Sequence, residues 1–201
     1  DWEPTASGVQ VRTNCGVYSA GALVFTSGAW TGKLLPELAS LAVPERQVLA
    51  WFKPLKPAFF TPSNFPVFTL AIDSGSFYGF PAYGGLGFKM GKFHHLGEQA
   101  DPDGLNRIPT PHDESVLRGF TEKYFPDAAG ETENMAICMF TNSPDEHFII
   151  GRHATYPQVS FAAGFSGHGF KFCSVVGEIM ADVSVKGDTD QDIQLFSPDR
   201  F

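Results

Sequence analysis

The stretch Gly164-Phe165-Ser166-Gly167-His168-Gly169-Phe170-Lys171-Phe172 joins a short apolar segment, residues 159–163, to a segment with helical periodicity. The apolar residues of the second segment recur at helical spacing: Phe172, Val176, Ile179, Met180 and Val183. Gly187 follows them and is a suitable C-cap. We therefore expect a buried strand that leads through a glycine-rich turn into the longest helix of the chain.

The start of this helix is a candidate anion site. A helix N-terminus has unpaired N–H groups and about half a positive charge, so it suits an anion or a ring that becomes anionic on reduction. The glycines allow the backbone to approach a ligand closely. Lys171 is unfavourable at this positive end, which indicates a second negative group nearby, and His168 between two glycines has no evident packing role. The alternative is a glycine-rich turn with a solvated lysine, and these residues alone leave both interpretations open.

Composition narrows the class of protein. The chain has 201 residues, which is enough for one sizeable core or for one domain and part of another. Only 18% of the residues are charged and 20 are Phe, a composition typical of a folded apolar interior. The net charge is −8 and there is no run of Lys or Arg, so nucleic acid is excluded as an expected partner.

The sequence predicts neither a membrane protein nor a metal protein. No apolar stretch reaches the length of a membrane span, and residue 1 begins no signal peptide. The three cysteines, Cys15, Cys138 and Cys173, are too widely spaced for a metal pair or a disulfide framework. Since the histidines also lack zinc-like spacing, we expect no metal site and a reducing compartment, the cytoplasm.

The first part of the chain has the pattern of a parallel α/β sheet. Residues 9–17 predict a hairpin. Residues 22–25 are an unbroken apolar run, followed by a helical pattern over 33–40, as in a fully buried strand that feeds a helix. One such strand cannot form a parallel sheet alone. We therefore expect residues 1–45 to be the remnant of an α/β domain whose other strands lie elsewhere.

The rest of the chain predicts a different architecture. Short strands separated by turns are expected at residues 47–52, 67–72, 77–80, 87–91, 134–141 and 147–150. Thr110 and Asp113 resemble a capping box before an apolar helical stripe, and Pro126 ends that helix. The predicted fold class is α+β: a mixed, largely antiparallel sheet with flanking helices, plus the α/β remnant. The predicted divisions are residues 1–45, 46–150 and 151–201.

Several residues within these elements could take part in chemistry. Lys89 lies on a short apolar strand, where it is either buried at an electrostatic cost or an edge-strand lysine turned to water. Cys138 lies on a predicted buried strand, where an inert thiol is the ordinary expectation. His94 and His95 would face opposite ways on a strand. Ser166 lacks the second glycine of a GxSxG elbow, which disfavours a serine hydrolase.

Seven motifs, in the same order, resemble the monomeric sarcosine oxidase and N-methyltryptophan oxidase family of flavin amine oxidases. They are Ser27-Gly28-Ala29-Trp30, Tyr78-Gly79-Phe80-Pro81, Gly87-Phe88-Lys89, Asp101-Pro102-Asp103, Cys138-Met139-Phe140-Thr141, Pro144 to Ile150 and Gly164 to Phe172. The resemblance runs from about residue 8 to residue 201. It covers only the C-terminal half of such an enzyme, without the FAD-binding βαβ unit, so the chain alone is expected to be inactive.

The resemblance implies an FAD-dependent oxidase of a small secondary amine that carries a carboxylate. In this family a hydride passes from the carbon next to the amine to the flavin, and oxygen then reoxidises the flavin to give hydrogen peroxide. The expected partners are this substrate, oxygen and the missing FAD-binding half. The alternative is a stand-alone chain of the same fold that binds a carboxylate ligand or a partner and has no flavin.

The resemblance also assigns roles to single residues. Cys138 matches the cysteine bonded to flavin, Lys89 the lysine that activates oxygen, and His94 the active-site histidine, with one extra residue between it and Lys89. The residues expected to bind substrate are Tyr78, Phe140, His168 and Lys171. Those expected to bind the cofactor are Gly28, Trp30, Cys138, Met139, Phe165, Gly167, His168, Gly169, Phe170 and Lys171. Phe140 replaces the family's tyrosine, which leaves sarcosine and a larger, more apolar amine equally credible.

Overall fold

The computed structural model describes residues 1–201, which fall into two units. Unit 1 consists of residues Asp1–Pro44 and Phe140–Phe201, and unit 2 of residues Glu45–Met139. No helix has both the length and the apolar character needed to cross a membrane. The domain boundaries expected from the sequence stay a prediction.

Unit 1 contains two three-stranded sheets. The first is an antiparallel sheet of β1 (Trp2–Thr5), β2 (Gly8–Thr13) and β3 (Gly16–Ala20). The second has the order β10-β11-β4 and consists of β10 (Ile149–Arg152), β11 (Val159–Ala163) and β4 (Leu23–Phe25). β4 pairs in parallel with β11 and β10 pairs antiparallel with it. The predicted hairpin is therefore present, with β1 added to it.

Two expectations for the first 45 residues are wrong. The segment 33–40 is not one helix but a short α1 (Thr31–Leu34) followed by a 3-10 turn, Pro36–Leu38. Pro36 explains the break, because proline has no N–H to continue the helical hydrogen bonds. β4 is also not fully buried, since Val24 is 37% exposed on this edge strand of the sheet.

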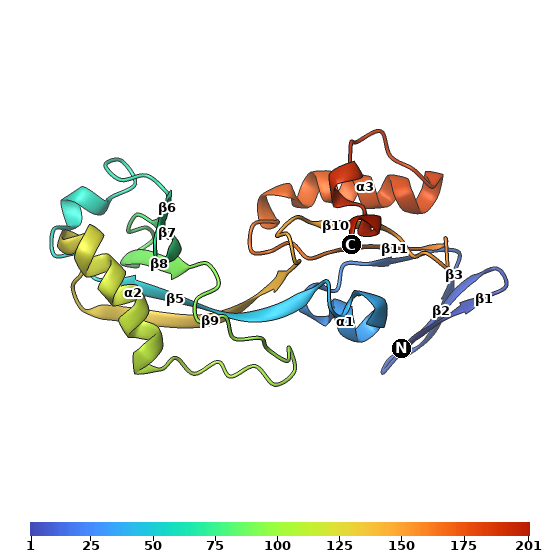
Figure 1. Ribbon diagram of the computed structural model, residues 1–201, viewed down its shortest axis with the longest axis horizontal. Coiled ribbons are helices and arrows are strands. Elements are labelled where there is room, and N and C mark those ends of the chain that lie inside the picture. Colours follow the sequence, from blue (N-terminus) through green and yellow to red (C-terminus); the bar gives the residue numbers. More distant parts are fainter. The chain divides into compact units, whose positions relative to one another are not determined.

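The long helix α3 (Cys173–Lys186) lies along β10 and β11 (Figure 1). Its buried residues Val176, Ile179, Met180 and Val183 pack with Phe148, Ile150 and Ala162 of the sheet layer. Gly187 ends it in the left-handed conformation, as expected. Phe172 is not part of the buried stripe, because a 3-10 turn, Phe170–Phe172, precedes the helix.

Unit 2 is organised by a five-stranded sheet in the order β6-β7-β8-β5-β9. The strands are β5 (Val43–Phe52), β6 (Phe68–Ile72), β7 (Gly75–Phe80), β8 (Phe88–Lys92) and β9 (Thr132–Asn142). The pairs β6·β7, β7·β8 and β8·β5 are antiparallel. The predicted α+β class with a largely antiparallel sheet is confirmed.

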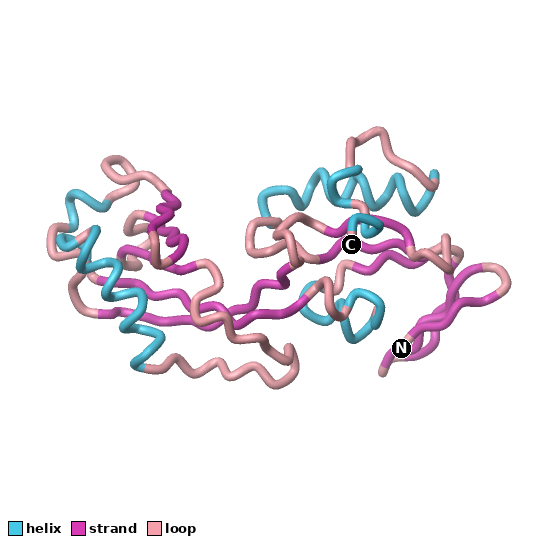
Figure 2. The backbone as a smooth tube through the Cα atoms, in the orientation of Figure 1, coloured by secondary structure: helices cyan, strands magenta, loops and turns pink.

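The helix α2 (Pro111–Tyr124) covers one face of this sheet, after a long loop from β8 (Figure 2). The predicted capping box is present: Thr110 Oγ1 accepts from the Asp113 N–H, and the Asp113 carboxylate accepts from the Thr110 N–H. Leu117 and Phe120 enter a phenylalanine-rich core, where Phe120 stacks on Phe77 with 3.9 Å between the ring centroids. The sheet therefore has one covered face and one that α2 leaves uncovered.

Candidate functional site

Strand pairing places the predicted site residues of unit 2 on the face opposite α2. Phe88, Met90 and Ile137 belong to the core under the helix. Because side chains alternate along a strand, Lys89 and Cys138 point to the other face. Lys89 lies opposite Trp51 on β5 and opposite Phe80 on β7. One sheet face thus brings together residues that the sequence resemblance assigns to different roles.

Lys89 occupies a central strand, so its interpretation as an edge-strand lysine is wrong. Its Nζ lies 5.1 Å from the ring centroid of Trp51 and 5.1 Å from that of Phe80. Each cation–π contact contributes about 0.5–2 kcal/mol, more where water is excluded. The same residues border an apolar hollow of about 400 Å³, in which Lys89 is the charged lining residue. The ammonium is therefore held at a defined place on the sheet face.

Cys138 has a free, half-buried thiol that lies outside the packed core. Burial raises the pKa of this thiol, while the positive charges of Lys89 and Arg107 act in the opposite direction. Both cations are therefore close to the sulfur. A cysteine of a packed apolar core would have no such neighbours, so the inert interpretation from strand pattern alone does not describe its surroundings.

Tyr78 lies on the same sheet face as Lys89 and Cys138. Burial is the main reason that the pKa of its hydroxyl is raised, and the neighbouring Cys138 adds to the shift. The tyrosine ring covers Gly91 of the paired strand, where a Cβ would lie 2.4 Å from the Tyr78 Cζ. The ring is also 4.8 Å from that of Phe93. Glycine at position 91 is what makes room for the tyrosine.

The adjacent histidines face different surroundings. His94 Nδ1 lies 3.1 and 3.3 Å from the two carboxylate oxygens of Glu45. His95 is 2% exposed, and its Nε2 lies 3.0 Å from Asp113 Oδ1. Burial lowers the pKa of His95 despite this carboxylate. Arg46 donates to both Asp113 oxygens at 2.8 Å, which holds the pKa of Asp113 well below its usual range.

The glycine-rich turn of unit 1 differs in one respect from expectation. α3 begins at Cys173 and not at residues 167–171, which form a turn and the start of the 3-10 segment. Lys171 is exposed, and its Nζ lies 5.2 Å from the Phe172 ring. Gly167 has a φ of +77°, and a Cβ there would lie 2.4 Å from the ring of Phe140. The turn thus packs directly on the residue that departs from the family pattern.

Ser166 and His168 do not form a nucleophile–base pair. The Ser166 hydroxyl is buried, donates to the Gly164 carbonyl and accepts from the Ser143 N–H. The His168 Nε2 donates to the Glu146 carbonyl at 3.0 Å. Both groups support the turn, and the hydrolase interpretation gains nothing from the geometry.

The other residues expected to bind the cofactor lie at separate places. Gly28 and Trp30 form a 3-10 turn after β4, and Gly28 has a φ of +54°. Met139 is half-buried on β9. The Phe165 ring covers Gly169, and Phe170 is 93% exposed. Their roles toward a cofactor stay predictions.

Sequence reasoning missed four residues around Lys89, Tyr78 and His94: Trp51, Phe80, Gly91 and Glu45. Trp51 and Glu45 lie an even number of positions apart on β5, so they share the face of Lys89. That periodicity was available in the sequence for Trp51, since a strand was predicted over 47–52, but Glu45 lies before that predicted strand. The sequence did not show which strand pairs with β5.

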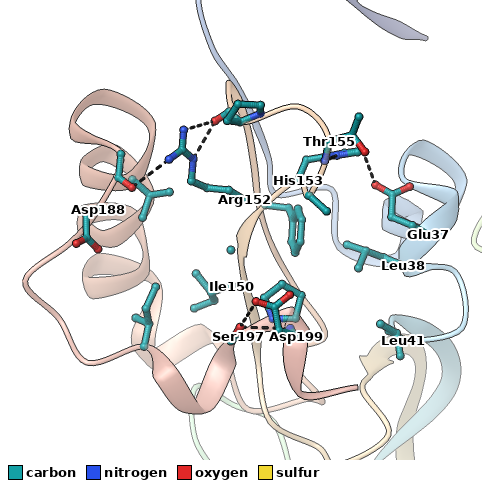
Figure 3. A pocket seen from close by; sticks show the side chains of 18 of the residues that line it. Glu37, Leu38, Leu41, Ile150, Arg152, His153, Thr155, Asp188, Ser197 and Asp199 are labelled. Atoms are coloured by element: carbon teal, nitrogen blue, oxygen red, sulfur yellow. Dashed lines mark hydrogen bonds and ion pairs between the residues drawn. The ribbon is translucent and has the colours of Figure 1, made fainter.

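Unit 1 also contains a hollow of about 750 Å³ that none of the expected site residues lines (Figure 3). Its polar groups support the chain itself. Arg152 donates to the Pro157 and Gly187 carbonyls, and His153 Nε2 lies 3.0 Å from Glu37. No group of three or more His, Cys, Asp or Glu side chains is arranged to hold a metal ion.

Comparison with known proteins decides the family. Residues 2–183 match the family described as FAD dependent oxidoreductase. The chain belongs to this family. The resemblance to sarcosine and N-methyltryptophan oxidases is confirmed by relatives that carry those names, and FAD is the cofactor by which the family is defined.

Three relatives show how far the similarity extends. A monomeric sarcosine oxidase from Bacillus sp. (strain NS-129) is 45% identical over 100% of the chain and 52% of its own length. Human peroxisomal sarcosine oxidase is 35% identical, and an N-methyl-L-tryptophan oxidase from Escherichia coli is 36% identical; each aligns over 96% of the chain and 51% of its own length. The chain thus spans about half the length of the curated relatives it matches.

Solved structures share the fold of this chain. L-proline dehydrogenase from P. horikoshii has a TM-score of 0.79 at 23% identity and covers 100% of this chain and 52% of its own. A Tyr258Phe mutant of NikD, an unusual amino acid oxidase of nikkomycin biosynthesis, has a TM-score of 0.79 at 22% identity, over 98% of this chain and 52% of its own.

The residues present fit the cofactor of the family. Cys138 offers a free thiol on an accessible sheet face with two cations nearby, which is suitable for attachment to a flavin.

Proposed function

We propose that the protein takes part in the FAD-dependent oxidation of a secondary amine that carries a carboxylate, such as sarcosine or another N-methyl amino acid. The observation that carries this proposal is the grouping of Lys89, Tyr78 and Cys138 on one sheet face of unit 2. FAD, when bound, takes up the hydride from the carbon beside the amine and passes the electrons to oxygen, which becomes hydrogen peroxide.

Lys89 supplies a fixed positive charge in this reaction. Trp51 and Phe80 hold the ammonium by their ring faces and limit its hydration. A preorganised charge stabilises negative charge that develops on oxygen without reorganisation at the moment of reaction. Lys89 is therefore assigned to the oxygen step and not to recognition of the amine.

Cys138 and the turn before α3 are assigned to holding the cofactor and the substrate. The sulfur of Cys138 would attach the flavin covalently, and the segment from Gly167 to Lys171 would face its pyrimidine ring. Lys171 and His168 would bind the substrate carboxylate, with Tyr78 and Phe140 lining the substrate cavity. Phe140 offers no hydroxyl, so an apolar N-substituted amino acid is favoured alongside sarcosine. A cytoplasmic location stays a prediction.

The proposal is tested on the complete protein that includes the FAD-binding half, by recording its visible absorption and by measuring peroxide release from sarcosine and from N-methyltryptophan. A flavin spectrum and peroxide from either amine are expected. A protein that binds N-methyl amino acids or plain carboxylates but carries no flavin would instead support the carboxylate-binding alternative. A flavoprotein that oxidises neither amine would contradict the substrate class.

A further inference from the structure

We propose that Arg200 and Asp145 are positioning residues that hold the glycine-rich turn, residues 164–169, in the conformation that binds the substrate carboxylate. This inference rests on the proposed function, which assigns His168 and Lys171 to that carboxylate. Asp145 lies within one of the motifs that resemble the family, but the resemblance assigned no role to it or to Arg200.

Arg200 and Asp145 form a bidentate ion pair within unit 1. Arg200 Nε donates to Asp145 Oδ2 at 2.7 Å, and Arg200 Nη2 donates to Asp145 Oδ1 at 2.9 Å. The arginine side chain is only 16% exposed, so water screens the pair incompletely. The guanidinium is the main reason that the pKa of Asp145 lies well below its usual range. Two parallel hydrogen bonds of this kind fix direction as well as distance.

Arg200 is itself held in place. Its Nη1 donates to the Ser197 carbonyl at 2.9 Å, and its Nη2 also donates to the His147 carbonyl at 3.2 Å. The 3-10 turn Pro198–Arg200 lies against β10, where a Cβ added to Gly151 would be 2.7 Å from Pro198 Cδ (Figure 1). The guanidinium therefore reaches Asp145 from a base that is attached to the sheet.

Asp145 organises the loop 143–147. Its Oδ1 accepts from the His147 N–H at 3.1 Å, and Ser143 Oγ donates to the His147 carbonyl at 2.6 Å. Glu146 has a φ of +61°, in the left-handed region, where a non-glycine residue costs about 1–3 kcal/mol and persists only if its surroundings hold it. The Arg200–Asp145 pair is one of the contacts that hold this loop.

The loop 143–147 in turn holds the glycine-rich turn at two points. The Ser143 N–H donates to Ser166 Oγ at 3.2 Å, and His168 Nε2 donates to the Glu146 carbonyl at 3.0 Å. Ser166 has a φ of +48°, so the turn also contains a non-glycine residue in the left-handed region. Lys171 follows three residues after His168, and its position depends on the path of this turn. A continuous set of contacts thus leads from Arg200 to the residues assigned to the carboxylate.

The test uses variants of the complete protein that includes the FAD-binding half. Arg200→Gln, Arg200→Lys and Asp145→Asn alter the pair, and the double variant Arg200→Gln with Asp145→Asn measures its coupling. Arg152→Gln is the matched control. Arg152 is also an arginine of unit 1, and it donates to the carbonyls of Pro157 and Gly187, neither of which belongs to the loop 143–147 or to the glycine-rich turn.

Two readouts are needed. The first is hydrogen exchange, followed by mass spectrometry without substrate, of peptides that cover the loop 143–147 and the glycine-rich turn. The second is the pair of constants KM and kcat for sarcosine or N-methyltryptophan, whichever amine the unmodified protein oxidises. Exchange reports whether the turn is held, and the split between KM and kcat reports whether substrate binding depends on it.

We expect Arg200→Gln to speed exchange of both segments about tenfold to a hundredfold, the effect of losing a charge-assisted hydrogen-bonded pair, and to leave the sheet β1–β3 unchanged. KM should rise about tenfold with kcat nearly constant, because the carboxylate is bound equally in the ground state and the transition state. Arg200→Lys keeps the charge without the fork and should lose less. The double variant should be no worse than Arg200→Gln, and Arg152→Gln should change neither readout.

Exchange that increases throughout unit 1 and not mainly in these two segments, or an equal KM in Arg200→Gln and Arg152→Gln, would overturn the inference. If Arg200→Gln does not fold, Arg200→Lys against Arg152→Gln gives the same two readouts. Exchange needs no turnover. Failure of the proposed function, seen as no oxidation of any N-methyl amino acid by the unmodified protein, is therefore distinct from a failure of Arg200 and Asp145 to hold the turn.

Discussion

Lys89 lies on a central strand, with its charge between the ring faces of Trp51 and Phe80. Its replacement should affect the two half-reactions of the flavin differently. Lys89→Met should slow reoxidation of the flavin by oxygen about 10²- to 10³-fold, because one preorganised charge is lost, and should affect reduction by substrate far less. Stopped-flow measurement of both steps checks this. Lys92→Met is the matched control, since Lys92 is on the same strand and contacts Phe77 on the other face. An equal loss in both half-reactions would assign Lys89 to general structure.

The thiol of Cys138 can be tested independently of turnover. Denaturation and precipitation should leave the flavin attached to the unmodified protein and release it from Cys138→Ser, because only a thioether survives unfolding. Cys173→Ser, at the exposed start of α3, should keep the flavin attached. Visible absorption of the precipitate and the supernatant decides between the two results. Flavin that leaves the unmodified protein would contradict the covalent assignment.

Residue identity was easier to predict than residue surroundings. The sequence indicated that Lys89 is an unusual residue on an apolar strand, and the resemblance assigned it a role. Its contacts with Trp51 and Phe80 depend on which strands flank β8, and strand order arises from long-range pairing that local periodicity does not contain. Glu45 was missed for the same reason, since its partner lies in a turn 49 residues away.

At the level of elements, the β7–β8 pair depends on a glycine opposite Tyr78. Gly91→Ala should displace the tyrosine ring, destabilise the protein by about 1–3 kcal/mol as other overpacked sites do, and raise KM for the amine. Gly119→Ala on α2, where a Cβ meets no atom within 4 Å, should instead stabilise by up to about 1 kcal/mol. Urea unfolding of the two variants tests whether Gly91→Ala lowers and Gly119→Ala raises the free energy of unfolding. Steady-state kinetics tests the change in KM. A harmless Gly91→Ala would show that Tyr78 is not held by that contact.

Element types were predictable where a local rule determines them. The capping box at Thr110 and the left-handed Gly187 were both read correctly from a few adjacent residues. The helix expected over 33–40 failed because Pro36 interrupts a pattern that was otherwise periodic. The start of α3 was misplaced because a 3-10 turn has nearly the same spacing as the first helical turn.

At the level of the whole molecule, unit 1 is assembled from the two ends of the chain. The apolar run at 22–25 is a strand that pairs in parallel with β11, more than a hundred residues later, although β10 makes the sheet mixed. Sequence composition contains no information on that partner. The family resemblance covered both segments but did not by itself state that they pair.

The two units should also respond differently to pH, because a buried histidine lies in only one of them. Burial lowers the pKa of His95, so below the ordinary histidine value of about 6.5 the unfolded chain binds a proton that the folded chain does not. Stability therefore falls as pH decreases from 7 to 5, by up to about 1.4 kcal/mol per pH unit for this one proton. The pKa of Asp113 is also lowered, but protonation of this carboxylate reduces the stability of the protein only below about pH 4.

Tryptophan fluorescence can follow unit 2 alone, since Trp51 is in that unit and Trp2 and Trp30 are in unit 1. In a Trp2→Phe, Trp30→Phe background, the urea midpoint reported by Trp51 should decrease between pH 7 and pH 5. His95→Gln keeps a donor for Asp113 but does not titrate, so it should be less stable at pH 7 and show little further loss at pH 5. His112→Gln, an exposed histidine on α2, should keep the pH dependence of the background. If His95→Gln kept the full slope, the titrating group would have to be sought outside the Arg46–Asp113–His95 network.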